Sequence, residues 1–449
     1  MATRALVLHP RLTSTAVTGP AGGPTPGQMM RDPNARLEEA VGLTSAIELM
    51  TAHAEVVTVA KPRPGTLFGS GQIERYANLA EQLDVDVVVI DHGLTPVQQR
   101  NLERRLNAKV IDRTQLILEI FGARARTHEG RLQVDLASLT FQRSRLVRSW
   151  THLERQRGGS GFMGGPGERQ LAIDRRLIGE RITRIRRELE DVKRTRELHR
   201  EARRRVPYPI VALVGYTNAG KSTLFNQLSG AEVVAQDLLF ATLDPTMRRI
   251  ELPAGRTVIL SDTVGFISDL PTQLVAAFRA TLEEVTEADV VMHVRDIAHP
   301  DTEAQKGDVL DVLDELGINE TTRAERMLEV LNKIDLLPED QRIALRQRTL
   351  ASNEPVIAVS AVTGEGVEAL IARVETLLTA DDRLCHFRVD LRDGDILAWL
   401  YAHGDVVERI DGDQHARVTV SFDPADLARF EKRFASRIEH TGGVPPNAG

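Results

Sequence analysis

The chain has 449 residues, 42% hydrophobic and 27% charged, with a formal net charge of −7, a composition ordinary for a globular protein of about three domains. A single cysteine, Cys385, excludes an internal disulfide framework, and no apolar run approaches the ~20 residues that a membrane-spanning helix needs. Since no signal peptide is evident either, we expect a cytoplasmic protein.

The N-terminal part of the chain divides into a Pro- and Gly-rich segment and an alternating region. Residues 1–35 are predicted to be flexible, because positions 12–35 are rich in Pro, Gly, Thr and Ala. Residues 36–130 then alternate short apolar runs with amphipathic patterns, which predicts an α/β domain with a parallel sheet covered by helices. Helices are expected near 36–52, at Gln72–Leu83 and at 95–106, and strands at Glu55–Val59, Val85–Ile90 and Lys109–Ile111.

Apolar residues follow a heptad spacing in residues 131–205. From Leu132 to Leu153 the intervals are 4, 3, 4, 3, 4 and 3, and a second series from Leu171 to Val192 keeps the same register. The glycine-rich stretch Gly158–Gly167 separates the two series, so we predict an antiparallel helical hairpin with a glycine-rich tip. Between Phe141 and Arg205 there are 19 Lys and Arg against 9 Asp and Glu, which favours a polyanionic partner. A hairpin that packs its seam on the protein's own core is the alternative.

The tip contains a literal G-x-G-x-x-G at Gly159–Gly164. A dinucleotide-binding loop of this pattern must follow a strand and open a crossover helix. Here the preceding element is a heptad-patterned helix. We therefore interpret the glycines as a slim turn that lets the backbone approach a partner closely.

A complete phosphate-binding motif opens the region 206–380. It reads G-x-x-x-x-G-K-S and lies between the predicted strand Ile210–Val214 and a helix beginning at Lys221, as the motif requires. Main-chain N–H groups of such a loop surround phosphates, Lys221 is expected to reach the β- and γ-phosphates, and Ser222 is expected to bind Mg²⁺. The predicted nucleotide-binding residues of this stretch are Gly215, Tyr216, Thr217, Asn218, Ala219, Gly220, Lys221, Ser222 and Thr223.

Three further motifs follow in order, each at the end of a predicted strand. After Thr257–Leu260 come Asp262, Thr263, Val264 and Gly265, where Asp262 can hold Mg²⁺ through water and the Gly265 N–H can sense the γ-phosphate. After Met327–Leu331 come Asn332, Lys333 and Asp335, and the Asp335 carboxylate can accept from guanine N1 and N2 together, which adenine cannot reciprocate. After Pro355–Val359 come Ser360, Ala361 and Val362, with a backbone N–H for guanine O6. The set predicts a domain that binds GTP and GDP.

Residues near these motifs bear on hydrolysis. Thr242, in the stretch Phe240–Thr246, is expected to close over Mg²⁺, with Thr246 as the alternative, and we predict catalytic roles for Lys221, Thr242 and Gly265. Phe266 follows the D-x-x-G motif where many GTPases carry a water-orienting Gln. Because phenylalanine cannot orient water, intrinsic hydrolysis is expected to be slow. Asn218 resembles the asparagine of cation-dependent GTPases, which makes K⁺ a second candidate cation.

The remainder of the chain is predicted to form a small α+β domain at 384–437, in the order β-α-β-β-α, followed by a flexible tail at 438–449. The fold class is therefore α/β, with an N-terminal α/β domain carrying the helical hairpin, a P-loop GTPase domain built on a parallel-rich sheet flanked by helices, and the small C-terminal domain.

Three long stretches make the sequence resemble one family. Residues 69–103, 110–121 and 164–176 are similar to the HflX family of ribosome-associated GTPases, and the likeness covers roughly residues 40–380. Phe266 and the stretch 240–246 look like the translation-factor-related class to which that family belongs. The resemblance implies a GTPase that binds the large (50S) ribosomal subunit and splits stalled or idle 70S ribosomes, often under stress. We also expect a monomer.

The resemblance also implies that the hairpin tip contacts 23S ribosomal RNA, in agreement with the surplus of arginine. One departure is Gly164, where family loops often place an Arg before G-P-G-E, which implies a weaker contact at the tip and weaker splitting. The candidate RNA-contacting residues are Arg157, Gly158, Gly159, Gly161, Gly165, Gly167 and Arg169.

Alternatives to ribosome splitting stay open. GTP could serve mainly as an affinity signal in a dormancy factor, or the chain could assist 50S assembly, with hydrolysis serving only as a release signal. A separate ATP site in the N-terminal domain has weak support from residues 66–71, and a peripheral membrane-associated fraction is a further alternative to a wholly cytoplasmic location.

Overall fold

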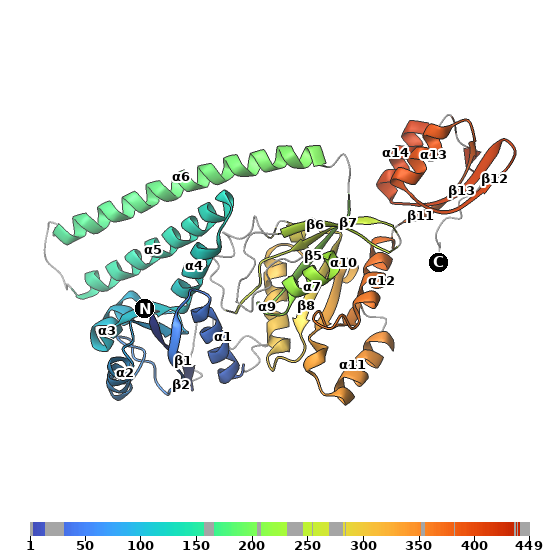
Figure 1. Cartoon of the computed structure of the whole chain (residues 1–449). Helices are drawn as coiled ribbons and strands as arrows, with labels where there is room; N and C mark the ends of the chain where they lie inside the picture. Colours follow the sequence, from blue (N-terminus) through green and yellow to red (C-terminus); the bar gives the residue numbers. More distant parts are fainter. Residues whose placement is uncertain are drawn as a thin grey trace. The chain divides into compact units, whose positions relative to one another are not determined.

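The computed structural model describes residues 3–13, 31–156, 166–203, 208–230, 246–253, 255–268, 282, 284–351, 355–380, 382–434, 437 and 439–440 (Figure 1). The chain divides into two compact units, one of Met1–Arg248 with Ile259–Val367 and one of Arg249–Val258 with Glu368–Gly449. Within the described ranges, no helix is both long and apolar enough to cross a membrane.

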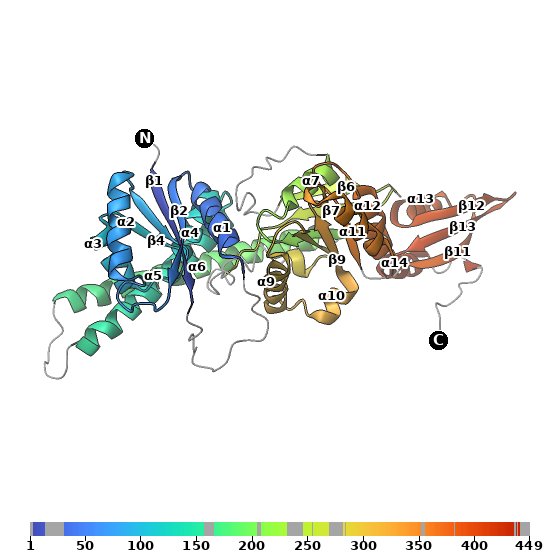
Figure 2. The same ribbon diagram turned by 90° about the horizontal axis from the view of Figure 1, so that it is seen from below.

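The N-terminal sheet lies between two helical layers, as predicted (Figure 2). Its strands are parallel and lie in the order β2-β1-β3-β4. Val7 of β1 packs with α1 and α4 on one face, whereas Leu6 and Leu8 pack with α2 and α3 on the other. This alternation follows from the two-residue period of a strand. The elements are β1 (Arg4–Leu12), α1 (Pro33–Ser45), β2 (Met50–Val59), α2 (Ser70–Gln82), β3 (Val87–Ile90), α3 (Pro96–Leu106), β4 (Lys109–Asp112) and α4 (Arg113–Arg124).

Two predictions for this region are wrong. The expected flexible segment 1–35 contains β1, an inner strand of the sheet. Its apolar run is short and is followed by Pro10, and a proline normally argues against an inner strand. In the structure β3 pairs only with Ala5–Leu8 of β1, so Pro10 interrupts no hydrogen bond between β1 and β3. The expected helix near 36–52 ends at Ser45, and β2 begins at Met50.

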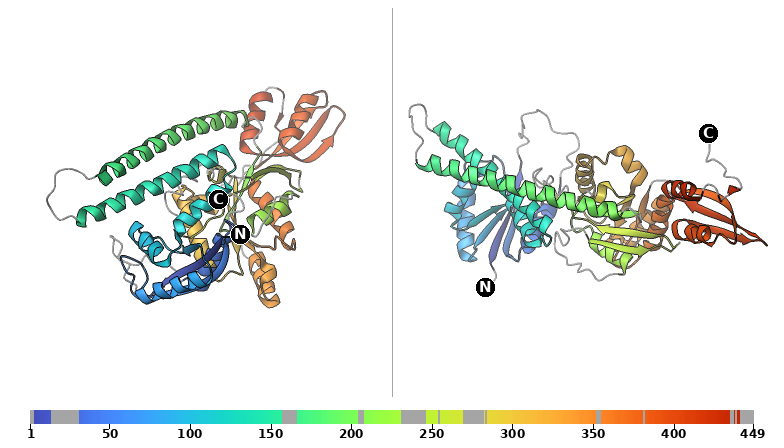
Figure 3. Two further views of the ribbon diagram at one scale, coloured as in Figure 1. Left: turned by 60° about the vertical axis from the view of Figure 1, so that its left-hand side comes forward. Right: turned by 90° about the horizontal axis from the view of Figure 1, so that it is seen from above.

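The heptad spacing corresponds to a seam between two long helices, α5 (His128–Gln156) and α6 (Pro166–Arg203), which lie side by side (Figures 1 and 3). The seam residues pack against one another, whereas Val134 and Ala137 of α5 join the cluster around α4. The seam is therefore shared by the two helices and is not laid on the N-terminal core. Its members are Leu132, Leu136, Leu139, Ile178, Ile182, Ile185, Leu189 and Val192.

The second sheet has the order β10-β9-β8-β5-β7-β6, and the pairs β10–β9, β9–β8, β8–β5 and β5–β7 are parallel. Strand β8 lies inside the sheet and is buried over six of its seven residues. Residues Val309 and Leu313 of α9 belong to one apolar cluster of this sheet, and Leu345 of α11 belongs to another. The elements are β5 (Ile210–Gly215), α7 (Lys221–Ser229), β6 (Thr246–Glu251), β7 (Thr257–Asp262), β8 (Val290–Asp296), α9 (Thr302–Glu315), α10 (Glu320–Arg326), β9 (Met327–Asn332), the 3₁₀ turn η1 (Ile334–Leu336), α11 (Glu339–Ala351), β10 (Val356–Ala358) and α12 (Val367–Leu378).

The C-terminal sheet is antiparallel, with the order β12-β13-β11-β14. An aromatic core joins it to its two helices, and Phe387 meets Phe430 edge to face at 4.8 Å. The predicted flexible tail from 438 is wrong at Glu439–His440, because these residues form β14 and pair with β11. The elements are β11 (Arg383–Asp390), α13 (Gly394–His403), β12 (Asp405–Asp411), β13 (His415–Phe422), α14 (Pro424–Phe434) and β14 (Glu439–His440).

Candidate nucleotide-binding site

The phosphate-binding motif forms the turn between β5 and α7. Gly215 has φ +151°, and a Cβ there would lie 2.1 Å from the Val294 carbonyl oxygen. Gly220 has φ +90°, and a Cβ there would lie 2.3 Å from Asn332 Nδ2. Both positions therefore require glycine, and the turn leads directly into the N-terminus of α7, where backbone N–H groups favour anions.

Lys221 is buried beneath this loop. Its Nζ donates to the carbonyl oxygens of Gly215 at 3.0 Å and Tyr216 at 2.8 Å. Burial lowers the pKa of Lys221 to about 8, against the attraction of Asp262, which raises it. A phosphate beside Nζ would favour the charged form of the amine.

Ser222 and Asp262 meet at the ends of α7 and β7. The Ser222 hydroxyl donates to Asp262 Oδ2 at 2.7 Å, and Asp262 is almost fully buried. A hydroxyl and a carboxylate are hard oxygen donors, so the pair fits a Mg²⁺ ion that also binds nucleotide phosphates. Thr242 lies outside the described residues, and Thr246 is the first residue of β6.

The D-x-x-G segment lies directly against the phosphate loop. The Phe266 N–H donates to the Gly215 carbonyl at 3.0 Å, and the Thr217 N–H donates to the Phe266 carbonyl at 2.7 Å. A Cβ on Gly265 would lie 3.1 Å from Lys221 Nζ, so the Gly265 main chain passes beside the amine. The Phe266 side chain is buried in an apolar cluster with Val264.

The side chain of Asn332 ties the phosphate loop to the segment after β10. Its Nδ2 donates to the Ala219 carbonyl at 2.8 Å, and its Oδ1 accepts from the Ala361 N–H at 3.0 Å. Lys333 has φ +64°, and its Nζ lies 2.9 Å from Asp296 Oδ2. Asp335 Oδ1 is buried and has no hydrogen-bond partner among the described residues, as expected for a group that accepts from guanine.

The four motifs therefore gather at the carboxyl ends of β5, β7, β9 and β10. Thr263 donates through Oγ1 to the Leu213 carbonyl at 2.6 Å, so its side chain supports the strand rather than a ligand. Asn218, with φ +59°, and Val362 are exposed. Thr223 and Ser360 lie within the same edge, and Ser360 Oγ accepts from the Thr363 N–H.

The predicted RNA-contacting residues fall mostly outside the described ranges. Arg157, Gly158, Gly159, Gly161 and Gly165 lie in the gap between α5 and α6. Gly167 and Arg169 lie in the first turn of α6, and the description there extends to the backbone.

Sequence reasoning missed the surroundings of Tyr216. Its hydroxyl donates to Glu39 Oε2 at 2.8 Å and accepts from the Ser268 N–H at 2.8 Å. Arg113 donates to the Ser268 carbonyl at 3.1 Å. The G-x-x-x-x-G-K-S motif does not specify the residue at position 216. A tyrosine there was therefore the one signal in the sequence that this side chain has a partner.

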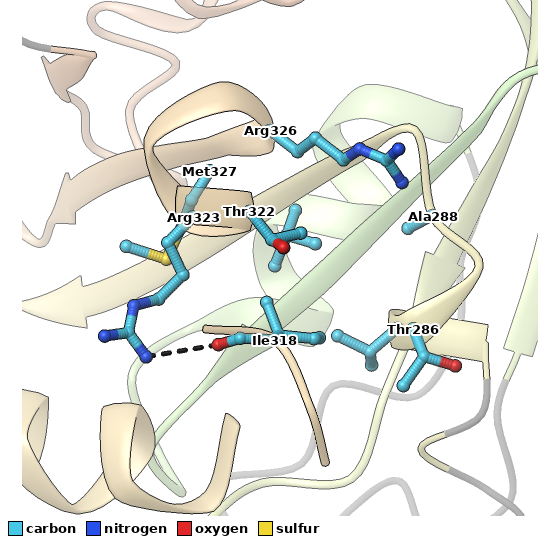
Figure 4. A pocket seen from close by; sticks show the side chains of 9 residues that line it. Thr286, Ala288, Ile318, Thr322, Arg323, Arg326 and Met327 are labelled. Carbon is cyan, nitrogen blue, oxygen red and sulfur yellow. Dashed lines mark hydrogen bonds between the residues drawn. The ribbon is translucent and has the colours of Figure 1, made fainter. Parts of the chain in front are cut away.

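A small hollow lies at the other end of the sheet, where β8 and β9 begin (Figure 4). Its lining is largely apolar, and the Arg323 guanidinium at its edge donates to the Ile318 carbonyl at 3.2 Å and pairs with Asp314. None of the nucleotide motifs contributes to it. The lining residues are Val285, Thr286, Ala288, Val291, Ile318, Thr322, Arg323, Arg326 and Met327.

Comparisons with known proteins cover nearly the whole chain. Four family models match, described as GTP-binding GTPase N-terminal (residues 34–122), GTP-binding GTPase Middle Region (124–203), 50S ribosome-binding GTPase (210–333) and HflX C-terminal domain (344–441). The chain is 52% identical to GTPase HflX of Magnetococcus marinus over 395 residues, 88% of this chain and 90% of that protein. It is 45% identical to GTPase HflX of Escherichia coli over 340 residues, 76% of this chain and 78% of that protein. Among solved structures, the crystal structure of SsGBP and GDP complex has a TM-score of 0.48 and 24% identity, covering 85% of this chain and 99% of that chain.

Proposed function

Because the chain belongs to the HflX family of GTPases and hydrolyses GTP, we propose that it binds the 50S ribosomal subunit and splits stalled or idle 70S ribosomes. The observation that carries the proposal is the presence, in one chain, of a guanine-nucleotide site and a basic two-helix hairpin. The family model that matches residues 210–333 is described as a 50S ribosome-binding GTPase.

The nucleotide site supports a switch that depends on the γ-phosphate. Lys221 and a Mg²⁺ ion held by Ser222 and Asp262 would stabilise charge on the transferred phosphoryl group during in-line attack of water. Gly265 would report the γ-phosphate through its N–H, and Asp335 would select guanine. We also propose Thr242 as a third Mg²⁺ ligand and K⁺ beside Asn218.

The hairpin supports a nucleic-acid partner. On α6, Arg175, Arg176, Arg186 and Arg187 are exposed, whereas Ile182 and Ile185 of the seam are buried. Exposed guanidinium groups supply sequence-independent affinity for phosphates by releasing counterions. The proposed contact is therefore with 23S ribosomal RNA, and it includes the tip Gly158–Gly167.

Sedimentation of 70S ribosomes tests the proposal directly. The profile is compared after incubation with the protein and GTP, a non-hydrolysable GTP analogue, or GDP. We expect subunits to appear with GTP and not with GDP, because the γ-phosphate orders the D-x-x-G segment that sets the ribosome-bound state. An unchanged profile with GTP would refute splitting.

A tip variant separates ribosome engagement from nucleotide binding. Replacing Gly158–Gly167 with a short inert turn should leave GDP affinity unchanged and abolish the subunit peaks. If GTP affinity falls equally, the tip belongs to a nucleotide site and the proposed RNA role is wrong. A dormancy or assembly factor would instead keep its function when hydrolysis is blocked, or would prefer immature particles.

A further inference from the structure

A buried polar cluster connects the N-terminal domain to the nucleotide site. Tyr216 belongs to the phosphate loop and is 4% exposed, and its hydroxyl lies 2.8 Å from both Glu39 Oε2 of α1 and the Ser268 N–H. Burial raises the pKa of Tyr216 well above its ordinary value, with a further contribution from Glu39. The phenol therefore stays protonated, donating to Glu39 while it accepts from Ser268.

Arg113 holds the other side of the same segment. Its guanidinium donates to the Ser268 carbonyl at 3.1 Å and to Ser268 Oγ at 2.8 Å, and it forms ion pairs with Glu39 and Asp91. Although burial by itself raises the pKa of Asp91, Arg113 and a hydrogen bond from His9 hold that pKa well below its usual range. A fully charged pair at this depth fixes the position of the guanidinium.

Ser268 stands three residues after Gly265. Between them, Phe266 is bonded through its N–H and its carbonyl to Gly215 and Thr217 of the phosphate loop. Residues 265–268 are thus held at one end by the phosphate loop. At the other end Ser268 is bonded by Arg36 and Arg113 of the N-terminal domain and by Tyr216, whose hydroxyl Glu39 holds. A misplacement of about 1 Å in such a loop can cost a hundredfold in rate.

We propose that Glu39 and Arg113 are positioning residues for GTP hydrolysis, acting through Tyr216 and Ser268 to hold the Gly265–Ser268 segment in place. Phe266 offers no side-chain group to orient water, so the reaction depends on where the main chain of this segment lies. The geometry explains why a phosphate-loop position that makes no demand on its side chain carries a buried tyrosine.

Single-turnover GTP hydrolysis by the full chain, without ribosomes, tests this role. Tyr216→Phe removes one donor and one acceptor and keeps the ring, and Glu39→Gln weakens the same contact from the other side. Each should lower the hydrolysis rate about tenfold and leave the Kd for GDP within about twofold. Because both remove or weaken the Tyr216–Glu39 contact, the double variant should be slower by clearly less than the product of the two single effects.

Asp308→Asn is the matched control. Asp308 of α9 pairs with Arg31 at 2.5 Å, a contact between the same two parts of the chain that does not touch residues 265–268. It should hydrolyse GTP at the unaltered rate. The proposal is overturned if Tyr216→Phe hydrolyses GTP at the original rate or faster, if GDP affinity falls in parallel, or if Asp308→Asn is equally slow. If Tyr216→Phe does not fold, Glu39→Gln alone decides.

Discussion

His293 lies in the interior of β8, in register with Val214 on one side and Glu329 on the other. It is 1% exposed, and its Nδ1 has no hydrogen-bond partner among the residues described. Burial lowers the pKa of His293 to about 3, with Glu329 opposing and Arg295 and Lys306 adding to the shift. The imidazole is therefore neutral in the folded protein near neutral pH.

Because of this histidine, the free energy of unfolding should fall as the pH is lowered. Above about pH 6.5 it is neutral in both states and contributes no pH dependence. Between about pH 6.5 and about 3, His293 is protonated in the unfolded chain and neutral in the folded chain. The free energy of unfolding therefore falls by about 1.4 kcal/mol for each unit by which the pH is lowered. Chemical denaturation of the protein and of His293→Leu, from about pH 7.5 to about pH 5, measures the difference in slope. Parallel curves for the two proteins would contradict the assignment.

Local main-chain chemistry explains which site residues could be predicted from the sequence. Gly215 and Gly220 stand where no other residue fits, and Asn332 and Asp335 follow a buried strand at a fixed distance, so spacing alone located them. Glu39 and Arg113 could not be located in this way. They lie 177 and 155 residues from Tyr216 and Ser268, and nothing in α1 or α4 marks them apart from other charged helical residues.

At the scale of elements, an apolar repeat predicts the packing of helices when it extends over many residues. The heptad series over α5 and α6 predicted the seam, because a 3.5-residue repeat places its apolar residues along one face of each helix. Strand β1 was missed because four apolar residues are compatible with many structures, and its partners β2 and β3 begin 38 or more positions beyond its end.

The packing of the seam predicts which substitutions lower the stability of the hairpin. Ile182 is 2% exposed between α5 and α6, so Ile182→Ala should cost about 2–5 kcal/mol through lost burial and the cavity left behind. Leu177→Ala, on the same helix but 53% exposed, should cost less than about 0.5 kcal/mol. Hydrogen exchange of the α5 and α6 amides reports the loss, with GDP affinity as the check that the nucleotide site is intact. Equal protection in the two variants would show that the seam does not hold the helices together.

At the scale of the whole molecule, the chain joins a site that binds GTP and GDP to a helical hairpin with exposed arginines. The nucleotide motifs occupy the carboxyl ends of parallel strands, the usual place for ligands in open α/β sheets. The buried contacts from Tyr216 to Glu39 link this edge to the domain from which α5 continues. Under the proposed function, RNA binding at the hairpin and the state of the γ-phosphate would influence each other through this domain, and by linkage the influence would run both ways.

This coupling predicts that 50S subunits or 70S ribosomes raise the GTPase rate strongly and that salt removes the increase. Each phosphate neutralised by an arginine makes affinity fall with salt, so raising ionic strength from about 0.05 M to about 0.2 M should reduce ribosome stimulation far more than the rate of the protein alone. Replacing Arg186 and Arg187 with Gln should lower the stimulation and flatten its salt dependence. Replacing Arg429 and Arg433 of α14 with Gln gives the same change in net charge on another helix and should leave both unaltered. A rate indifferent to ribosomes, or an equal loss in the α14 control, would show that the hairpin arginines do not make this contact.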